Sequence, residues 1–398
     1  MAEGDVRLGP TARISWAALA VGVLAGVVCL IGGIGRPGEL ERAYLEAVTY
    51  FMGFSLGALS WLMVQHLVRG AWGVLCRRVW EAAAITIPLF FILLLPVFFD
   101  LSTFYPWADP LAIEAMEPRF AGKVEAKGAY FTPWFFWVRT LVVFGVFIAL
   151  AGLLVVWSGQ HDARGDWWLL RRMSYLSGPG LFIFGLAITF AATDWWKSLM
   201  PAWYSTMYPV IHAVGFAVGA LALAVLLVVA LARPGRPLAP YLNERLYGHL
   251  GNLLLAMVLL WIYVNFGQYL ITWSGDLPDK IQWFVPRVQT SWKWVAGALL
   301  VLHFALPFLI LVPHRNRRSP AILAGVSIGL IALRAVDTHF LLAPSVRPEG
   351  AFVSWLDFTA LVAVGGIWIA VFTWVLAGRS LLPRARDPLV AHLPQEKP

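Results

Sequence analysis

The sequence has few cysteines. Only two, Cys29 and Cys76, occur among its 398 residues, and neither belongs to a Cys-x-x-Cys or Cys-x-x-Cys-His motif. Disulfide frameworks, iron–sulfur clusters and covalently attached haem all need sets of cysteines. We therefore expect none of these three features in this chain alone, and we interpret both thiols as structural.

Charge is also scarce. Charged residues make up 13% of the chain and hydrophobic residues 60%, whereas a typical soluble domain carries about 25% charged residues. The formal net charge of +8 would suit a nucleic-acid-binding protein, but the basic residues lie in short loops between apolar runs. That pattern is typical of membrane orientation. The sequence therefore predicts a polytopic protein surrounded by membrane lipids, with no nucleic acid as a partner.

Motifs for common enzyme chemistry are missing as well. The chain has no P-loop, no dinucleotide-binding glycine pattern and no hydrolytic motif. We accordingly assign no catalytic, cofactor-binding or metal-ligating residue from the sequence.

Apolar runs dominate what is present. A helix needs about 20 apolar residues to cross a bilayer, and the first run is expected to be retained because its flanks lack a signal-peptide layout. We predict an all-α fold of about ten transmembrane helices, at about 13–35, 43–68, 79–99, 134–157, 173–193, 204–232, 246–273, 291–312, 320–343 and 353–377.

Arginines indicate the orientation, because cytoplasmic loops are enriched in basic residues. With the N-terminus inside, each inner loop between two spans holds three arginines, and both chain ends are cytoplasmic. These arginines are Arg69, Arg77 and Arg78; Arg164, Arg171 and Arg172; Arg233, Arg236 and Arg245; and Arg315, Arg317 and Arg318.

Polar side chains inside the spans are the candidate functional residues, since exposing an ionisable group to lipid costs about 2.5–3.5 kcal/mol on insertion scales. A rise of about 1.5 Å per residue sorts them by depth. Near the inner face lie Gln65, His66, Glu81, His249 and Asn252. The outer half holds Glu46, Arg139, His212, Asn265, Gln268, Asp337, His339 and Asp357, and His303 and Arg334 lie close to the middle.

Structural readings compete with functional ones. An interfacial position is favoured for the three inner candidates His66, Glu81 and His249, which lie about a turn from predicted helix ends. Three outer candidates have the alternative of reaching the outer surface: Glu46, Arg139 and Asp357.

The stretch around residue 334 needs its own interpretation. Arg334 and Asp337 are three residues apart, so they can pair on one helix face, as a structural clamp or as a gate. His339 is rotated by about 200° from Asp337 and should serve another contact.

The functional hypothesis from these residues is a pair of proton half-channels. Protons would enter from the inner group, cross near His303 and Arg334, and leave through Asp337 and its outer neighbours, although an adjacent arginine disfavours a proton on Asp337. The proton-transfer candidates are His66, Glu81, His249, His303, Arg334, Asp337, His212 and Asp357.

Two other chemistries stay open. A b-type haem needs two facing histidines at matched depth, for which His212 and His339 are the plausible outer pair. A secondary transporter favours helices broken near mid-membrane, but the stretch LSGPGLF (176–182) lies near a helix end.

Short stretches along nearly the whole chain carry a family pattern: QHLVRGAWG (65–73), YPWADP (105–110), DWWKSLMPAWYSTMY (194–208), FGQYLITWSGDLP (266–278), HFALPF (303–308) and RAVD (334–337). In this order they resemble the F-type membrane subunit of bacterial alternative complex III. That complex is a quinol:cytochrome c or cupredoxin oxidoreductase, and the subunit is a branch of the polysulfide-reductase (NrfD-like) membrane-subunit family. The chain departs from the pattern at Gln65, where the family often has histidine, and at Gly267, where it often has serine.

The resemblance implies two four-helix bundles, helices 2–5 and 6–9, flanked by helices 1 and 10. The expected divisions are residues 1–42, 43–193, 194–343 and 344–398. It also implies three partners in a bacterial cytoplasmic membrane: a homologous membrane subunit, an iron–sulfur subunit and multihaem cytochrome c subunits.

For function, the resemblance implies a subunit that supports assembly and takes part in proton translocation or quinone binding. Haem c and iron–sulfur clusters would belong to the partner subunits, and quinone or quinol is the one ligand expected near this chain, at unassigned residues. The alternative function is a secondary transporter or another ion-translocating membrane protein.

Overall fold

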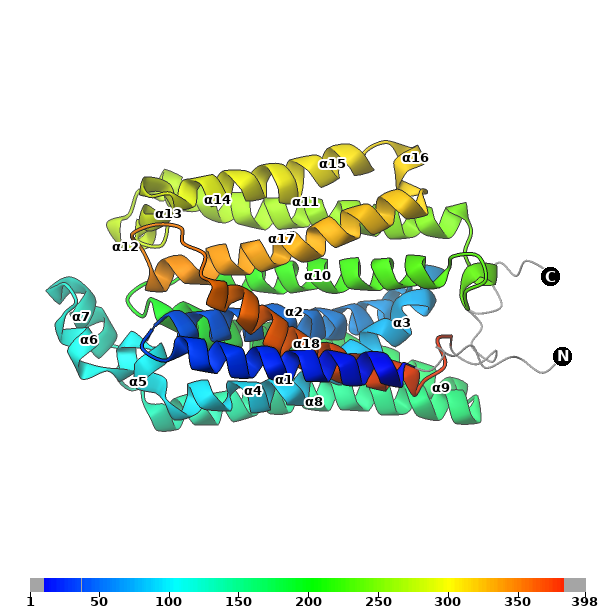
Figure 1. Cartoon of the computed structure of the whole chain (residues 1–398), viewed down its shortest axis with the longest axis horizontal. Helices are drawn as coiled ribbons and strands as arrows, with labels where there is room; N and C mark the ends of the chain where they lie inside the picture. The colour runs from blue at the N-terminus through cyan, green and yellow to red at the C-terminus, as the bar shows by residue number, and fades with distance from the viewer. Residues whose placement is uncertain (1–10, 37, 383–398) are drawn as a thin grey trace.

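The computed structural model describes residues 11–36 and 38–382 of the chain. Within these residues the fold is all-helical, and ten helical segments are long and apolar enough to cross a membrane. Figure 1 shows them as a bundle of roughly antiparallel helices. The all-α fold with ten membrane-spanning helices predicted from the sequence is confirmed, and the protein is a multi-pass membrane protein.

Seven spans are single helices. They are α1 (Ala12–Gly33), α2 (Glu39–Val68), α8 (Pro133–Arg164), α10 (Met207–Leu231), α11 (Glu244–Gly275), α17 (Pro320–Val346) and α18 (Trp355–Ala377). Since α1 begins and α18 ends at the same end of the bundle (Figure 1), we call that end the inner end and the opposite one the outer end. The inner end is the side predicted to be cytoplasmic.

Three spans are composite, and prolines account for two of the breaks. The third span joins α3 (Ala71–Ala84) to α4 (Ile87–Phe99), and the eighth joins α14 (Trp292–Ala298) to α15 (Leu306–Leu311) through the π-helical segment η5 (Leu299–Ala305). Pro88 and Pro307 lack the N–H that a regular helix would bond to the carbonyls four residues earlier, which belong to Ala84 and His303. The fifth span consists of α9 (Trp167–Ala191), the π-helical η2 (Ala192–Trp196) and η3 (Lys197–Leu199).

Short helices cap both ends. The outer end carries α5 (Leu101–Phe104), η1 (Pro106–Ala108), α6 (Pro110–Glu114), α7 (Pro118–Glu125), α12 (Pro278–Ile281) and α13 (Val285–Gln289). The inner end carries η4 (Ala239–Tyr241) and α16 (His314–Arg317). Several of the outer helices begin with proline, whose fixed φ and missing N–H suit a first helical position.

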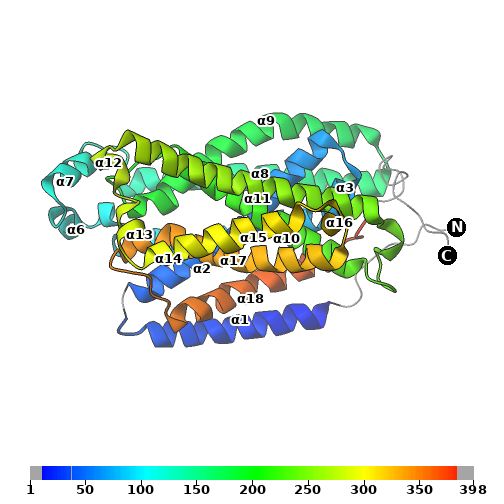
Figure 2. The ribbon, with the colours of Figure 1, turned by 90° about the horizontal axis from the view of Figure 1, so that it is seen from above.

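Helix α2 lies at the centre of the packing. It contacts α3, α4, α9, α10, α17 and α18, whereas α1 packs mainly along α18 at the side of the bundle (Figures 1 and 2). Through their mutual contact, α2 and α10 join α3, α4, α8 and α9 to α11, α14, α15 and α17, and α3 also touches α11 directly. The residue boundaries expected for the two bundles remain a prediction.

The third span corrects the sequence interpretation. We expected this span to begin at residue 79, with Arg77 and Arg78 in an inner loop, but α3 begins at Ala71 and both arginines are fully buried within it. Their charges are neutralised by neighbouring carboxylates, which local hydropathy does not reveal. The fifth span similarly continues to Leu199, through residues expected to begin an outer loop.

Glycine permits the close approach of α2 to α10. A Cβ atom on Gly57 would overlap the backbone carbonyl of Phe216, so the two helices touch there through main chain. Small residues serve this purpose between membrane helices.

We predict that Gly57→Val lowers the thermal stability of the purified protein, because the added carbons force apart the two central helices. Overpacking of this kind costs about 1–3 kcal/mol. The measurement is thermal unfolding in detergent. Gly152→Ala on α8 is the control, since nothing lies within 4 Å of a Cβ atom there. An equal loss of stability in both variants would contradict the prediction.

Candidate functional site

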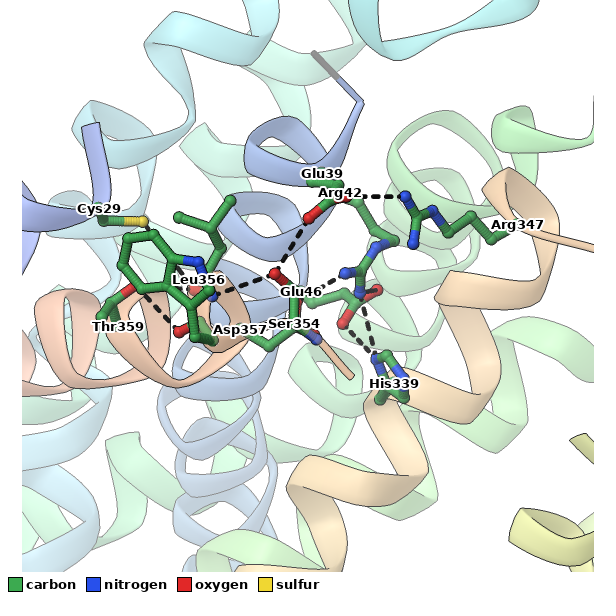
Figure 3. Close-up of polar contacts among 11 residues, drawn as sticks. Cys29, Glu39, Arg42, Glu46, His339, Arg347, Ser354, Leu356, Asp357 and Thr359 are labelled. Atoms are coloured by element: carbon green, nitrogen blue, oxygen red, sulfur yellow. Dashed lines mark hydrogen bonds and ion pairs between the residues drawn. The ribbon is translucent and has the colours of Figure 1, made fainter. Parts of the chain in front are cut away.

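Four charged or titratable side chains gather at the outer end, on α2, α17 and α18 (Figure 3). We call Arg42, Glu46, His339 and Asp357 the outer cluster. Arg42 Nη1 donates to Glu46 Oε1 at 3.1 Å, and Nδ1 of His339 lies 2.7 Å from Glu46 Oε2. Arg42 Nη2 forms an ion pair with Asp357 Oδ1 at 2.8 Å. The cluster therefore ties three helices together.

Further contacts connect the outer cluster to side chains nearer the outer end of the bundle. Ser354 and Asp357 form a capping box at the start of α18, in which Asp357 Oδ2 accepts the Ser354 N–H at 2.8 Å. Ser354 Oγ donates to Glu39, which also pairs with Arg347 at 3.0 Å (Figure 3). Glu39 and Arg347 are more exposed than the cluster and lie between it and the outer end.

Charge is unequal within the outer cluster. One arginine faces two carboxylates, so with His339 neutral the cluster carries one negative charge in excess. A proton on His339 balances that excess. Because a carboxylate accepts hydrogen bonds, the 2.7 Å contact with Glu46 places the proton of a neutral His339 on Nδ1 and leaves Nε2 as an acceptor. In the described part of the chain, Nε2 is buried without a hydrogen-bond partner.

A cavity of about 300 Å³ adjoins the cluster between α2, α14, α17 and α18. Its walls are mostly apolar, and its polar side chains are Glu46, Tyr50, His339 and Asp357. Phe358, which also lines it, is 63% exposed on the surface that faces lipid in a membrane. The cavity thus joins a lipid-facing surface to a group of proton-binding side chains.

The pair predicted for Arg334 and Asp337 is present within α17. Both side chains are buried, and Arg334 Nη1 bonds to Asp337 Oδ2, which also accepts Trp261 Nε1 at 3.1 Å. His303 lies in the π-helical segment with its ring 4.2 Å from that of Trp261. Sequence reasoning brought Arg334 and Asp337 together, whereas Trp261 completes the link to His303.

The guanidinium of Arg334 is accommodated by α10. A Cβ atom on Gly215 would overlap this group, so glycine leaves the room that the arginine occupies. As expected, His339 lies on a different face of α17 from Asp337 and contacts α2.

His212 lies in an aromatic environment on α10. Its ring stacks on Trp196 at 4.3 Å and meets the edge of Tyr208 at 4.6 Å. Neither ring nitrogen has a hydrogen-bond partner among the described residues. His212 and His339, the pair considered for haem, belong to separate groups of side chains.

Glu81 is the centre of a buried inner cluster. Its Oε1 accepts from Arg77 Nε at 2.9 Å and from Ser158, and its Oε2 accepts from Arg78 at 2.6 Å and from Arg379 at 3.1 Å. Both oxygens of Glu81 thus accept hydrogen bonds from side-chain donors. The expected interfacial position of Glu81 is wrong, since the residue is 1% exposed.

Neither of the two inner histidines is hydrogen-bonded to this carboxylate in the described residues. His66 is buried, also against the interfacial interpretation, and its Nε2 has no partner within the described residues. His249 is half-buried on α11. The structure gathers Glu81 with arginines but does not bring the three inner candidates into one hydrogen-bonded chain.

Arg139 forms a further outer pair that reaches into the cap. It binds Asp194 through two nitrogens, Nε at 2.8 Å and Nη2 at 3.1 Å, and Tyr130 donates to the same carboxylate at 2.8 Å. Burial, followed by the nearby Asp194 charge, raises the pKa of the Tyr130 hydroxyl, so it stays a donor. The alternative that Arg139, Glu46 and Asp357 reach the outer surface is wrong, since all three are buried.

The outer cap is also anchored to α17. Arg287 of α13 is buried, donates to the carbonyls of Trp283 at 2.6 Å and Leu341 at 2.8 Å, and lies over the Trp283 ring. Burial lowers the pKa of this guanidinium from its ordinary value.

Sequence reasoning missed several members of these clusters. Arg42 had a local signal, since Glu46 follows it at i+4. Asp162, Asp194 and Arg379 had none, because their partners lie far away in the chain.

Comparison with models of known protein families gives no match for this chain, and comparison with curated proteins gives none. Among the described residues, no group of three or more His, Cys, Asp or Glu side chains is placed to hold a metal ion. The family resemblance and the residue roles derived from it therefore stay predictions.

We predict that Glu81→Gln destabilises the protein by about 3–5 kcal/mol, because it leaves buried guanidinium groups without their shared counter-charge. Unfolding in detergent measures the effect. The control is Glu117→Gln, which removes an exposed pair with Arg119 and should change stability by less than about 1 kcal/mol. Similar stability of the two variants would contradict a structural role for Glu81.

Proposed function

We propose that the chain is a membrane subunit of a quinol:electron-acceptor oxidoreductase of the alternative complex III type, and that the cavity beside the outer cluster binds the quinol ring. One observation carries the binding assignment. A cavity of about 300 Å³ on the lipid-facing surface is lined by a histidine whose buried Nε2 has no partner and whose Nδ1 faces a carboxylate.

The shape and polarity of the cavity suit this class of ligand. Quinols combine a dihydroxylated six-membered ring with a long apolar tail, so they approach a protein from the membrane. Small-molecule sites are mostly apolar with a few polar groups that fix orientation. The exposed Phe358 and Val353 at the cavity provide a surface along which the tail extends into lipid.

The outer cluster supplies proton chemistry. Oxidation of a quinol to a quinone releases two electrons and two protons. His339 accepts a hydroxyl proton at Nε2 while Glu46 holds Nδ1 and thereby orients the ring. The two protons pass through His339 one after the other and leave past the carboxylate of Glu39 toward the outer end, while Arg347 stays protonated and pairs with Glu39. One-electron carriers on the partner subunits implied by the resemblance, iron–sulfur or haem groups, would take up the two electrons.

A larger cavity on another face of α17 supports this assignment less well. It has a volume of about 410 Å³ and is lined by Asp337, Asn265 and Gln268 among apolar residues. Asp337 is already bonded to Arg334 and Trp261, so this cavity offers no comparable proton acceptor. The half-channel from His66 and Glu81 toward mid-membrane remains a prediction.

One observation favours the second candidate, an ion-translocating protein. The π-helical segment around His303 interrupts a span near mid-membrane, and transporters build binding sites at such breaks. Transport of ions by the chain alone in vesicles, without redox partners, would favour this candidate.

We predict that mild solubilisation of native membranes recovers this chain together with an iron–sulfur protein and c-type cytochromes. Haem absorbance and metal analysis of the purified material measure this. Recovery of the intact chain free of any redox protein, from membranes that carry out quinol oxidation, would contradict the proposed complex.

The quinol site has a separate test. Ala335→Phe fills the cavity, so photolabelling of the chain by a quinone analogue should fall at least tenfold, whereas Ile328→Phe on the exposed face of the same helix should leave labelling unchanged. His339→Gln should weaken labelling and slow quinol oxidation by the complex. Undiminished labelling of a folded Ala335→Phe variant would place the site elsewhere.

A further inference from the structure

A separate cavity lies at the inner end of the bundle, between the start of α11 and the turn that joins α16 to α17. Its volume is about 490 Å³. Three basic side chains line it, His314, Arg315 and Arg318, together with Tyr247, Ser319 and a single acid, Glu244.

Two arginine side chains of this inner cavity form no close ion pair within the described part of the protein. Arg317, next to the cavity, donates to Asn252 at 2.7 Å and so serves the fold. By contrast, Arg318 lies 3.8 Å from Glu244, a loose contact between exposed side chains. Within residues 11–36 and 38–382, the exposed side chain of Arg315 forms no hydrogen bond or ion pair. Two guanidinium groups are therefore available to an outside ligand.

The cavity is formed by close packing of α16 on α11. A Cβ atom on Gly251 would lie 2.5 Å from the carbonyl oxygen of Arg317, so a larger residue at position 251 would prevent this close packing of α16. Gly248 lies beneath Arg318, whose Cγ would be 3.4 Å from an added Cβ atom. The two glycines thus allow Arg317 and Arg318 to pack directly against the start of α11.

Apolar side chains lie beside this basic cavity. Leu309 is 66% exposed and Val312 is 47% exposed, and both precede α16 on the surface that faces lipid in a membrane. A ligand here would meet guanidinium groups at one end and acyl-chain surroundings at the other. Anionic amphiphiles have that chemistry, and basic pockets between membrane helices on the cytoplasmic side bind such headgroups.

We propose that this inner cavity binds the phosphate headgroup of an anionic phospholipid. Arg315 and Arg318 bind the phosphate oxygens, because guanidinium groups match phosphate geometry with paired hydrogen bonds. Tyr247 lies at the level of the headgroup, where amphipathic aromatic side chains are enriched. The excess of arginine at the inner end is also expected to orient the protein in the membrane. Orientation alone, however, does not require a preformed cavity whose guanidinium groups lack close partners.

The test is lipid retention by the full chain, purified from vesicles of phosphatidylcholine containing cardiolipin and washed with neutral detergent. Retained phospholipid is counted by native mass spectrometry. We expect the double variant Arg315→Gln, Arg318→Gln to retain at least tenfold less cardiolipin than the unchanged chain. The matched control Arg233→Gln, Arg236→Gln removes two exposed arginines of another inner loop and should retain the normal amount.

A variant of opposite sign separates binding from misfolding. Glu244→Gln removes the one acid of the cavity and should raise retention. Equal loss in the Arg233, Arg236 control, or no loss in the Arg315, Arg318 variant, would overturn the site. Displacement of the lipid by millimolar inorganic phosphate would reassign the cavity to free phosphate.

Discussion

Pairing of buried charges is the constraint on which the rest of this bundle depends. An arginine within a membrane-spanning helix is stable only where a counter-charge and hydrogen-bond acceptors replace water. The chain meets this need through ion pairs between helices: Arg42 joins α2 to α18, Arg78 joins α3 to α8, and Arg139 joins α8 to η2. The same pairs that make burial possible therefore also fix which helices are neighbours.

The clusters differ in which side-chain atoms lack a hydrogen-bond partner, and on this difference we base the proposed division between structural and chemical roles. Glu81 has donors on both oxygens, and Asp337 is balanced by Arg334. In the outer cluster two carboxylates share one arginine, and a histidine nitrogen beside the cavity is unpartnered in the described structure. Helix α17 thus holds a paired carboxylate at Asp337 and, two residues further on, a histidine whose buried Nε2 has no hydrogen-bond partner among the described residues.

Local sequence patterns predicted the features that depend on residues close together in the chain. Apolar runs defined ten spans, and a spacing of three residues paired Arg334 with Asp337 while turning His339 elsewhere. The start of α3 was mispredicted because two adjacent arginines, Arg77 and Arg78, are typical of a loop. Their acceptors Ser158 and Asp162 lie on α8, far away in the sequence. Asp194 was likewise predicted to lie in a loop, because no neighbouring residue in the sequence indicates its partner Arg139. The outer cluster draws on three separate helices, so no single stretch of sequence could reveal it.

The π-helical segment around His303 has a geometric consequence for the whole eighth span. A π-helical turn holds an additional residue compared with an α-helical turn, so the helix on its outer side is turned by about 100° relative to an uninterrupted α-helix. Trp292–Ala298 therefore faces the outer cavities with side chains that a continuous helix would direct elsewhere. In evolutionary terms, a single inserted codon is enough to produce such a segment, and loss of one codon would turn every side chain of α14 by about 100° around the helix axis in one step.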